Sequence, residues 1–120
     1  MTLTQIDFAT QVRNTIFSRG GTVLTPTSAI NVVVWRAPFV ATVTKVLGYT
    51  SGTTGSVVNA RRNGLTLLVS NLTLGSADTW LDGGTVQNTA FSVGDKLEIM
   101  LVSVAGSPAE IAVEVQCVRP

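Results

Sequence analysis

The sequence predicts an all-β domain: a two-sheet antiparallel β-sandwich of about eight strands, preceded by an N-terminal arm or short helix. Short runs rich in Val, Ile and Thr recur along the chain, and turn-forming residues separate them roughly every 8 to 12 residues. A jelly roll is the favoured topology, and an immunoglobulin-like sandwich is the alternative. The 120 residues suffice for one domain with one hydrophobic core.

Residues 1–20 differ in pattern from the rest of the chain, and we predict that they form the arm. Apolar residues recur there at near-helical spacing, which is compatible with a short helix or with an extended segment that lies on a neighbour. The predicted contact residues of the arm are Ile6, Phe8, Val12, Ile16 and Phe17. Arg19-Gly20-Gly21 predicts the boundary, so that residues 21–120 form the sandwich domain.

Two strands are predicted before residue 36. Residues 23–25 form a short first strand, which ends at Pro26. Residues 29–35 are rich in β-branched side chains and apolar on both faces, which predicts a buried strand with Trp35 in the core. Pro38 cannot donate to a sheet ladder, so residues 36–39 are predicted to form a bend or an edge.

Residues 40–49 form the next predicted strand, and both of its faces carry methyl groups. One face holds Ala41, Val43, Leu47 and Tyr49, with Lys45 as the exception. The other face is predicted to point outward as a subunit interface, and it holds Val40, Thr42, Thr44 and Val46.

The strongest local pattern is Asn63-Gly64 between two strand-like runs. A two-residue type I′ turn needs positive φ at both central positions, and Asn-Gly tolerates this best. The turn pairs Arg62 with Leu65 and Arg61 with Thr66, and it predicts that Leu65, Leu67 and Val69 share one face. Arg61 and Arg62 either lie on a solvated edge or contact an acidic patch on a partner.

Alternation continues towards the C-terminus. Residues 71–75 are predicted as a connection with some strand character, residues 77–81 and 85–91 as possible strands, and residues 93–96 as a turn. Residues 96–104 form a strand with Leu97, Ile99 and Leu101 on one face. Residues 110–118 form the last strand, whose inward residues are Ile111, Val113, Val115 and Cys117.

The sequence carries no pattern typical of catalysis, and we predict no enzyme activity, no cofactor and no metal. It has no histidine, so Ser-His and Cys-His nucleophiles are absent, and Cys117 alone cannot build a thiolate zinc site. Asp78 and Asp82 are predicted to shape a turn, with a bound cation as the less favoured alternative. Trp80, which lies next to polar loops, fits core, interface or ligand contact, and Tyr49 is a second candidate for a ligand or partner contact.

The charge and the hydropathy of the chain limit the classes of partner that it is predicted to bind. Charged residues make up 12% of the chain, against about 25% in a typical domain, and the chain holds 17 Thr and 9 Ser. The net charge of +1 argues against nucleic-acid binding, and no apolar run reaches the roughly 20 residues that a membrane span needs. A mean hydropathy of +0.40 therefore favours apolar surface that is buried against other copies or another protein. We find no signal peptide, which predicts synthesis in a cytoplasm.

The order of the turn motifs resembles that of small β-sandwich modules in tailed-bacteriophage virion proteins. The resemblance covers about residues 30–120 and departs from the family at Arg62, where the family usually has lysine. The matching motifs, separated by Thr/Val-rich strands, are Arg36-Ala37-Pro38-Phe39, Thr54-Gly55-Ser56, Arg62-Asn63-Gly64 and Val93-Gly94-Asp95-Lys96-Leu97.

The resemblance implies a structural virion protein. A small chain with an arm is similar to capsid decoration (cement) proteins, which oligomerise, often as trimers, and bind the major capsid protein on the capsid surface. The arm would then anchor to the capsid or to a neighbouring copy. One alternative is a tail, baseplate or head-fibre component that binds a host receptor or glycan, with Trp80, Tyr49 and residues 78–84 as the contact. The other is a cellular sandwich module, such as a toxin or lectin-like protein.

Overall fold

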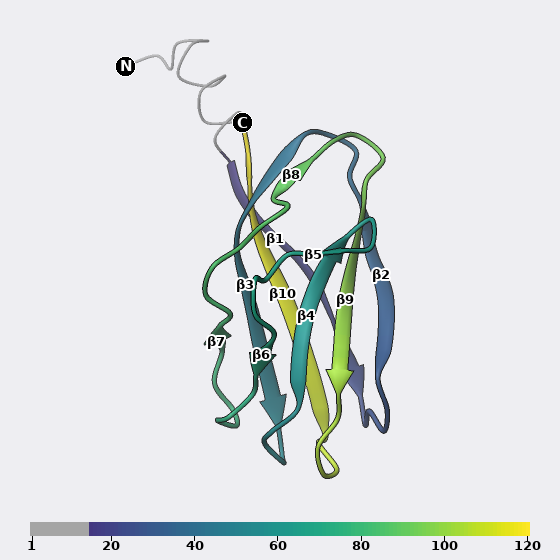
Figure 1. Ribbon diagram of the computed structural model, residues 1–120, viewed down its shortest axis with the longest axis vertical. Helices are drawn as coiled ribbons and strands as arrows, with labels where there is room; N and C mark the ends of the chain where they lie inside the picture. The colour runs from purple at the N-terminus through teal and green to yellow at the C-terminus, as the bar shows by residue number, and fades with distance from the viewer. Residues whose placement is uncertain (1–14) are drawn as a thin grey trace, which may run out of the picture.

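A computed structural model describes residues 15–120, and these residues form ten β-strands and no helix (Figure 1). None of the described segments is therefore a helix long and apolar enough to cross a membrane. The strands are β1 (Thr15–Leu24), β2 (Ile30–Arg36), β3 (Ala41–Ser51), β4 (Val57–Arg62), β5 (Leu65–Thr66), β6 (Leu72–Thr73), β7 (Leu81–Asp82), β8 (Ala90–Phe91), β9 (Lys96–Ser103) and β10 (Glu110–Arg119).

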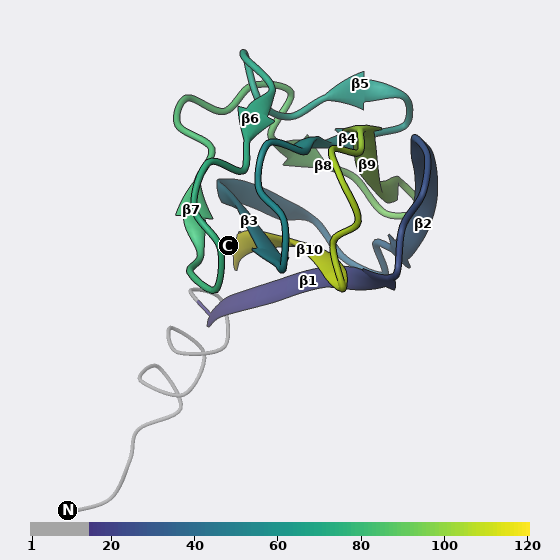
Figure 2. The same ribbon diagram turned by 90° about the horizontal axis from the view of Figure 1, so that it is seen from below.

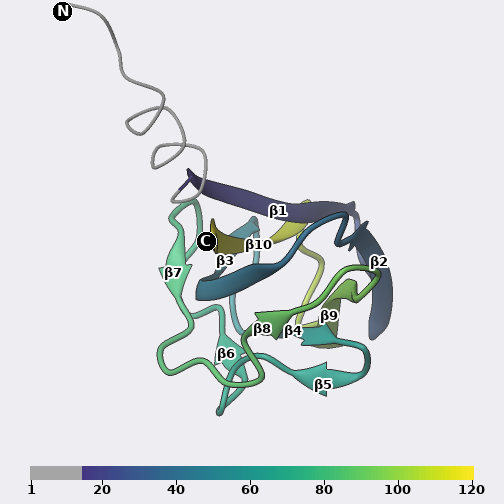
Figure 3. The ribbon, with the colours of Figure 1, turned by 90° about the horizontal axis from the view of Figure 1, so that it is seen from above.

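The strands form two antiparallel sheets that face each other (Figures 2 and 3). The first sheet has the order β1-β10-β3-β7, with β8 also pairing with β3, and the second has the order β2-β9-β4-β5, with β6 also pairing with β4. β5 and β6 thus share one position in their sheet, and β7 and β8 share another. The ten strands fill eight positions, and the chain changes sheet after each of β1, β2 and β3. The predicted β-sandwich is confirmed, and its strand order is that of a jelly roll.

The core lies between the two sheets, and β9 and β10 supply much of it. Alternate residues of these strands point inward, as their sequence pattern predicts. The buried residues are Leu97, Ile99 and Leu101 of β9 and Ile111, Val113, Val115 and Cys117 of β10.

The predicted hairpin at Asn63-Gly64 is confirmed. Asn63 has a φ of 50° and Gly64 a φ of 86°, and the turn pairs Arg62 with Leu65 and Arg61 with Thr66. The prediction for the residues beyond it is wrong, because β5 ends at Thr66. Leu65 and Val69 are exposed, whereas Leu67 and its neighbour Leu68 are both buried, so the alternation does not continue past the hairpin.

Residues 15–20 were predicted to belong to the arm, but they form part of strand β1. The strand runs unbroken from Thr15 to Leu24 and pairs with β10 throughout, so Arg19-Gly20-Gly21 does not interrupt it. A Cβ atom on Gly20 would collide with the carbonyl oxygen of Val113, so the strand needs glycine there for close pairing with β10. The remaining part of the predicted arm, with Ile6, Phe8 and Val12, lies outside the described residues.

β2 is an edge strand and not the buried strand that its apolar sequence predicts. Within the described chain it pairs with β9 alone, and Ile30 is 45% and Val33 53% exposed. Trp35 is partly buried and packs against the core, in a cluster with three phenylalanines. The local sequence could not separate the two cases, because an apolar strand fits both a central and an edge position.

The middle segments 77–81 and 85–91 contribute less strand than predicted. The first supplies only the start of β7, and the second supplies β8 and an isolated bridge between Val86 and Leu68. The segment 71–75 behaves as predicted, with β6 as its short strand.

A β-bulge changes which residues of β3 face inward. Lys45 pairs with Gln116 and Val43 with the next residue, Cys117, so Thr44 is the extra residue in β3. The extra residue shifts the alternation by one. Val46, predicted to point outward with Val40, Thr42 and Thr44, is therefore fully buried in the core, and the prediction for it is wrong.

Candidate functional surface

Metal-binding clusters and an accessible thiol are both absent from the described part of the chain. Residues 15–120 contain no cluster of His, Cys, Asp or Glu that could hold a metal ion. The thiol of Cys117 is buried, and burial raises its pKa to about 11, so it stays protonated at neutral pH and does not act as a nucleophile. Asp82 accepts a hydrogen bond from the backbone N–H of Gly84 at 2.8 Å, as a turn-forming aspartate does.

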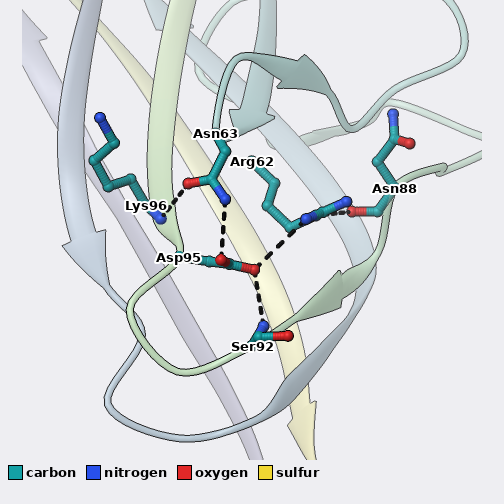
Figure 4. Close-up of polar contacts among 6 residues, drawn as sticks. All are labelled: Arg62, Asn63, Asn88, Ser92, Asp95 and Lys96. Carbon is teal, nitrogen blue, oxygen red and sulfur yellow. Dashed lines mark hydrogen bonds and ion pairs between the residues drawn. The ribbon is translucent and has the colours of Figure 1, made fainter.

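Arg61 and Arg62 each form an ion pair with a carboxylate of the same chain. The guanidinium of Arg61 lies 3.2 Å from Glu98. The guanidinium of Arg62 lies 3.5 Å from Asp95 and donates to the carbonyl of Asn88 at 2.9 Å (Figure 4). Each arginine has its own carboxylate partner, so neither presents an unpaired charge to an acidic partner.

Asp95 is the centre of the cluster in Figure 4, which links the hairpin turn at Asn63 to the residues at the start of β9. Its carboxylate accepts hydrogen bonds from the backbone N–H of Ser92 at 2.8 Å and from the amide of Asn63 at 2.9 Å. The amide oxygen of Asn63 accepts from the backbone N–H of Lys96 at 2.9 Å. The Ser92 bond, then the Asn63 bond and the charge of Arg62, hold the pKa of Asp95 below its ordinary value of 3.8.

We expect this lowered pKa to make the protein sensitive to acid. A carboxylate whose pKa is lower in the folded chain stabilises the fold above its unfolded pKa, and this contribution is lost as the pH falls through the folded pKa. The free energy of unfolding of the wild type should fall more steeply than that of Asp95→Asn between roughly pH 4 and pH 2. Urea denaturation across that range measures both slopes, and equal slopes would contradict the prediction.

The outward residues of β3 offer one candidate interface. Val40 precedes the strand and is 53% exposed, and Thr42 and Thr44 are exposed on the strand itself. Thr44 donates to the carbonyl of Gln116 on β10 at 3.2 Å. These three residues lie at the surface, as a subunit interface requires, whereas Val46 does not. Their role in a subunit contact stays a prediction.

A second surface lies where β1 and β2 meet along one side of the sandwich. Each is an edge strand in the described chain, and each exposes apolar side chains, namely Ile16 and Leu24 on β1 and Ile30 and Val33 on β2. Unpaired strand edges and apolar side chains together favour contact with another protein.

An aromatic cluster fills the gap between these edges. Phe17, predicted as an arm contact, packs edge-on against Trp35 at 5.6 Å and against Phe39 at 5.5 Å between ring centroids. The guanidinium of Arg19 lies 4.9 Å from the ring centre of Phe17, and that of Arg119 lies 4.2 Å from that of Phe39. Sequence reasoning missed both arginines. Arg19 lies two residues from Phe17 on the same strand, whereas Arg119 and Phe39 are distant in sequence and meet only in the fold.

Trp80 and Tyr49 do come together, on the outer face of the first sheet. Their ring centroids are 5.2 Å apart, and Trp80 is 48% exposed. The Tyr49 hydroxyl donates to the Asp78 carboxylate at 3.4 Å, and desolvation, followed by the charge of Asp78, raises the pKa of Tyr49. Trp80 lines a groove of about 410 Å³ between itself and β1. This groove is open to solvent, and one of the predicted contact residues, Trp80, lines it.

Comparison with known proteins supports the fold. Neither protein-family models nor curated proteins gave a match. Among solved structures, a chain of the "Cyanophage Pam1 capsid asymmetric unit" is similar, with a TM-score of 0.52 and 18% sequence identity. The match covers 89% of this chain and 86% of that chain, so the two chains are close in length. The predicted resemblance to phage virion β-sandwich modules is thus confirmed at the level of the fold.

Proposed function

We propose that this chain is a structural protein of a phage virion, namely a capsid decoration (cement) protein that oligomerises and binds the major capsid protein on the capsid surface. The observation that carries the proposal is the fold shared over nearly the whole of both chains with a chain of a cyanophage capsid.

The surface supports this proposal. A protein that cements a lattice needs broad contact area and no reaction chemistry, and this chain pairs low charge with two exposed edge strands. We assign the capsid contact to the β1–β2 side, with Ile16, and to the segment that precedes β1, with Ile6, Phe8 and Val12. We assign contacts between copies, in a trimer, to Val40, Thr42 and Thr44.

Two measurements test the proposal. Capsids prepared without this protein should bind it saturably and carry it into the pellet on sedimentation, whereas failure to sediment would contradict the capsid role. Light scattering should give a native mass near three times 12.6 kDa. A monomer would contradict the trimer and leave the capsid role to be judged by sedimentation.

A matched pair of variants locates the interface between copies. Val40 and Val69 are similarly exposed, at 53% and 58%, but only Val40 lies in the proposed interface. Val40→Lys should lower the native mass, because a buried unpaired charge is costly at an interface. Val69→Lys should leave the native mass unchanged, and an equal effect of both would contradict the assignment.

A further inference from the structure

We propose that the groove beside Trp80 binds a neutral pyranose sugar, a function beyond attachment to a capsid. We call it the Trp80 groove, and the residues that define it are Ser18, Gly20, Thr22, Trp80, Ala112 and Glu114. At about 410 Å³ it falls within the roughly 300–1,000 Å³ typical of small-ligand sites.

The floor of the groove is the outer face of β1 and β10. Thr22 pairs with Ala112, and Gly20 pairs with Glu114, so these side chains share a face opposite to the core residues of β10. Ala112 carries only a methyl group, and it leaves space where a larger side chain would fill the surface. Gly20 contributes by letting β1 lie close to β10, because a Cβ atom there would collide with the carbonyl oxygen of Val113.

One wall of the groove is an aromatic ring held in place. Trp80 leads into β7, where Leu81 pairs with Gly48, and its ring packs beside that of Tyr49. Trp80 nevertheless remains 48% exposed. An indole ring that the fold fixes and leaves open offers a flat apolar surface, against which the C–H face of a pyranose ring packs well.

The other groups around the groove are hydrogen-bonding side chains that the described chain leaves unused. Within residues 15–120, the side chains of Ser18, Thr22 and Glu114 make no hydrogen bond or ion pair. A carboxylate accepts hydrogen bonds from neighbouring sugar hydroxyls, and Ser and Thr hydroxyls both donate and accept. Arg19 is also among the residues around the groove, but its guanidinium lies over the rings of Phe17 and Trp35, on the opposite face of β1 from Glu114. A cation is therefore the competing ligand for the Glu114 carboxylate, and the titration includes one.

The test is a titration of the wild-type protein with methyl α-glucopyranoside, methyl α-galactopyranoside and N-acetylglucosamine, with choline chloride as a cationic probe. Amide NMR shifts and tryptophan fluorescence report binding. At least one sugar should bind saturably at millimolar concentration, with shifts at Thr22, Trp80 and Glu114. Saturable binding of choline at these residues, or no saturable binding of any of the three sugars, would overturn the proposal.

Variants connect the binding to the groove. Trp80→Ala should weaken sugar binding at least tenfold, and Glu114→Gln should weaken it severalfold, with both proteins retaining the amide dispersion of the wild type. Val93→Ala is the control, because Val93 is exposed and does not line the groove. Wild-type sugar affinity in Trp80→Ala would overturn the proposal.

The site is separable from capsid attachment. Trp80→Ala should sediment with capsids as the wild type does. Loss of capsid binding in this variant would make the groove a capsid contact and overturn the sugar proposal, while leaving the decoration function intact.

Discussion

Replacing Asn59 with leucine should lower the free energy of unfolding by about 3 kcal/mol, because it orphans buried backbone groups. Asn59 is fully buried in β4. Its amide oxygen accepts from the backbone N–H of Ala60 at 2.7 Å and from that of Leu68 at 3.1 Å. Its amide nitrogen donates to the side chain of Asn71 at 2.8 Å.

The position of Asn59 explains the size of the effect. β5 ends at Thr66, so the chain beyond it no longer forms a regular ladder with β4. The side chain of Asn59 takes the place of a partner strand there and satisfies two buried N–H groups. Leucine has a similar volume but no polar atom, and each buried donor left unpaired costs about 1–3 kcal/mol.

Asn71→Ala is the matched control for this prediction. Asn71 is exposed, and its truncation removes one hydrogen bond from the same network, so the loss should be about 1 kcal/mol or less. Chemical denaturation of the three proteins measures the differences. Equal losses in the two variants would show that the backbone bonds of Asn59 add nothing to stability.

The elements that the sequence predicts well are those whose pattern is local. β9 and β10 alternate cleanly, and each has neighbours on both sides, so the apolar residues of one face must lie in the core. The Asn63-Gly64 turn is likewise set by two residues whose φ angles decide the turn type.

The sequence predicts poorly those elements whose structure depends on a partner strand that is distant in the sequence. The bulge in β3 appears only through its register with β10, although Lys45 among apolar neighbours was a visible irregularity. The edge position of β2 depends on which strands the fold places beside it. Asn59, a polar residue inside an apolar run, was a signal that sequence reasoning did not use.

The residues of the candidate surface were likewise predictable from the sequence only in part. Trp80 and Tyr49 could be selected from their residue types, and the structure places their rings side by side. Their role as ligand or partner contacts stays a prediction. The floor of the groove could not, because Gly20 and Ala112 become neighbours only when the two ends of the chain pair. Gly20 in the sequence indicates a break, and in the structure it is part of a strand.

Two truncations should have opposite effects, and together they define where the folded domain begins. A chain that starts at Thr15 keeps every described strand, so its melting temperature should match that of the full chain. A chain that starts at Thr25 lacks β1, which pairs with β10 along ten residues and packs Phe17 and Val23 against the core. Its loss would leave one edge of β10 unpaired and expose Val113 and Val115, so this chain should show no cooperative unfolding.

Circular dichroism during heating measures both truncations, and capsid sedimentation adds the functional result. The chain that starts at Thr15 should fold but bind capsids less, because it lacks the proposed anchor with Ile6, Phe8 and Val12. Unfolding of this chain would place residues 1–14 in the structural core, and undiminished binding would remove them from the capsid contact. A cooperative transition in the chain that starts at Thr25 would show that the sandwich folds without β1. It would contradict the prediction that the fold needs β1 to pair with β10, the same pairing that forms the floor of the groove.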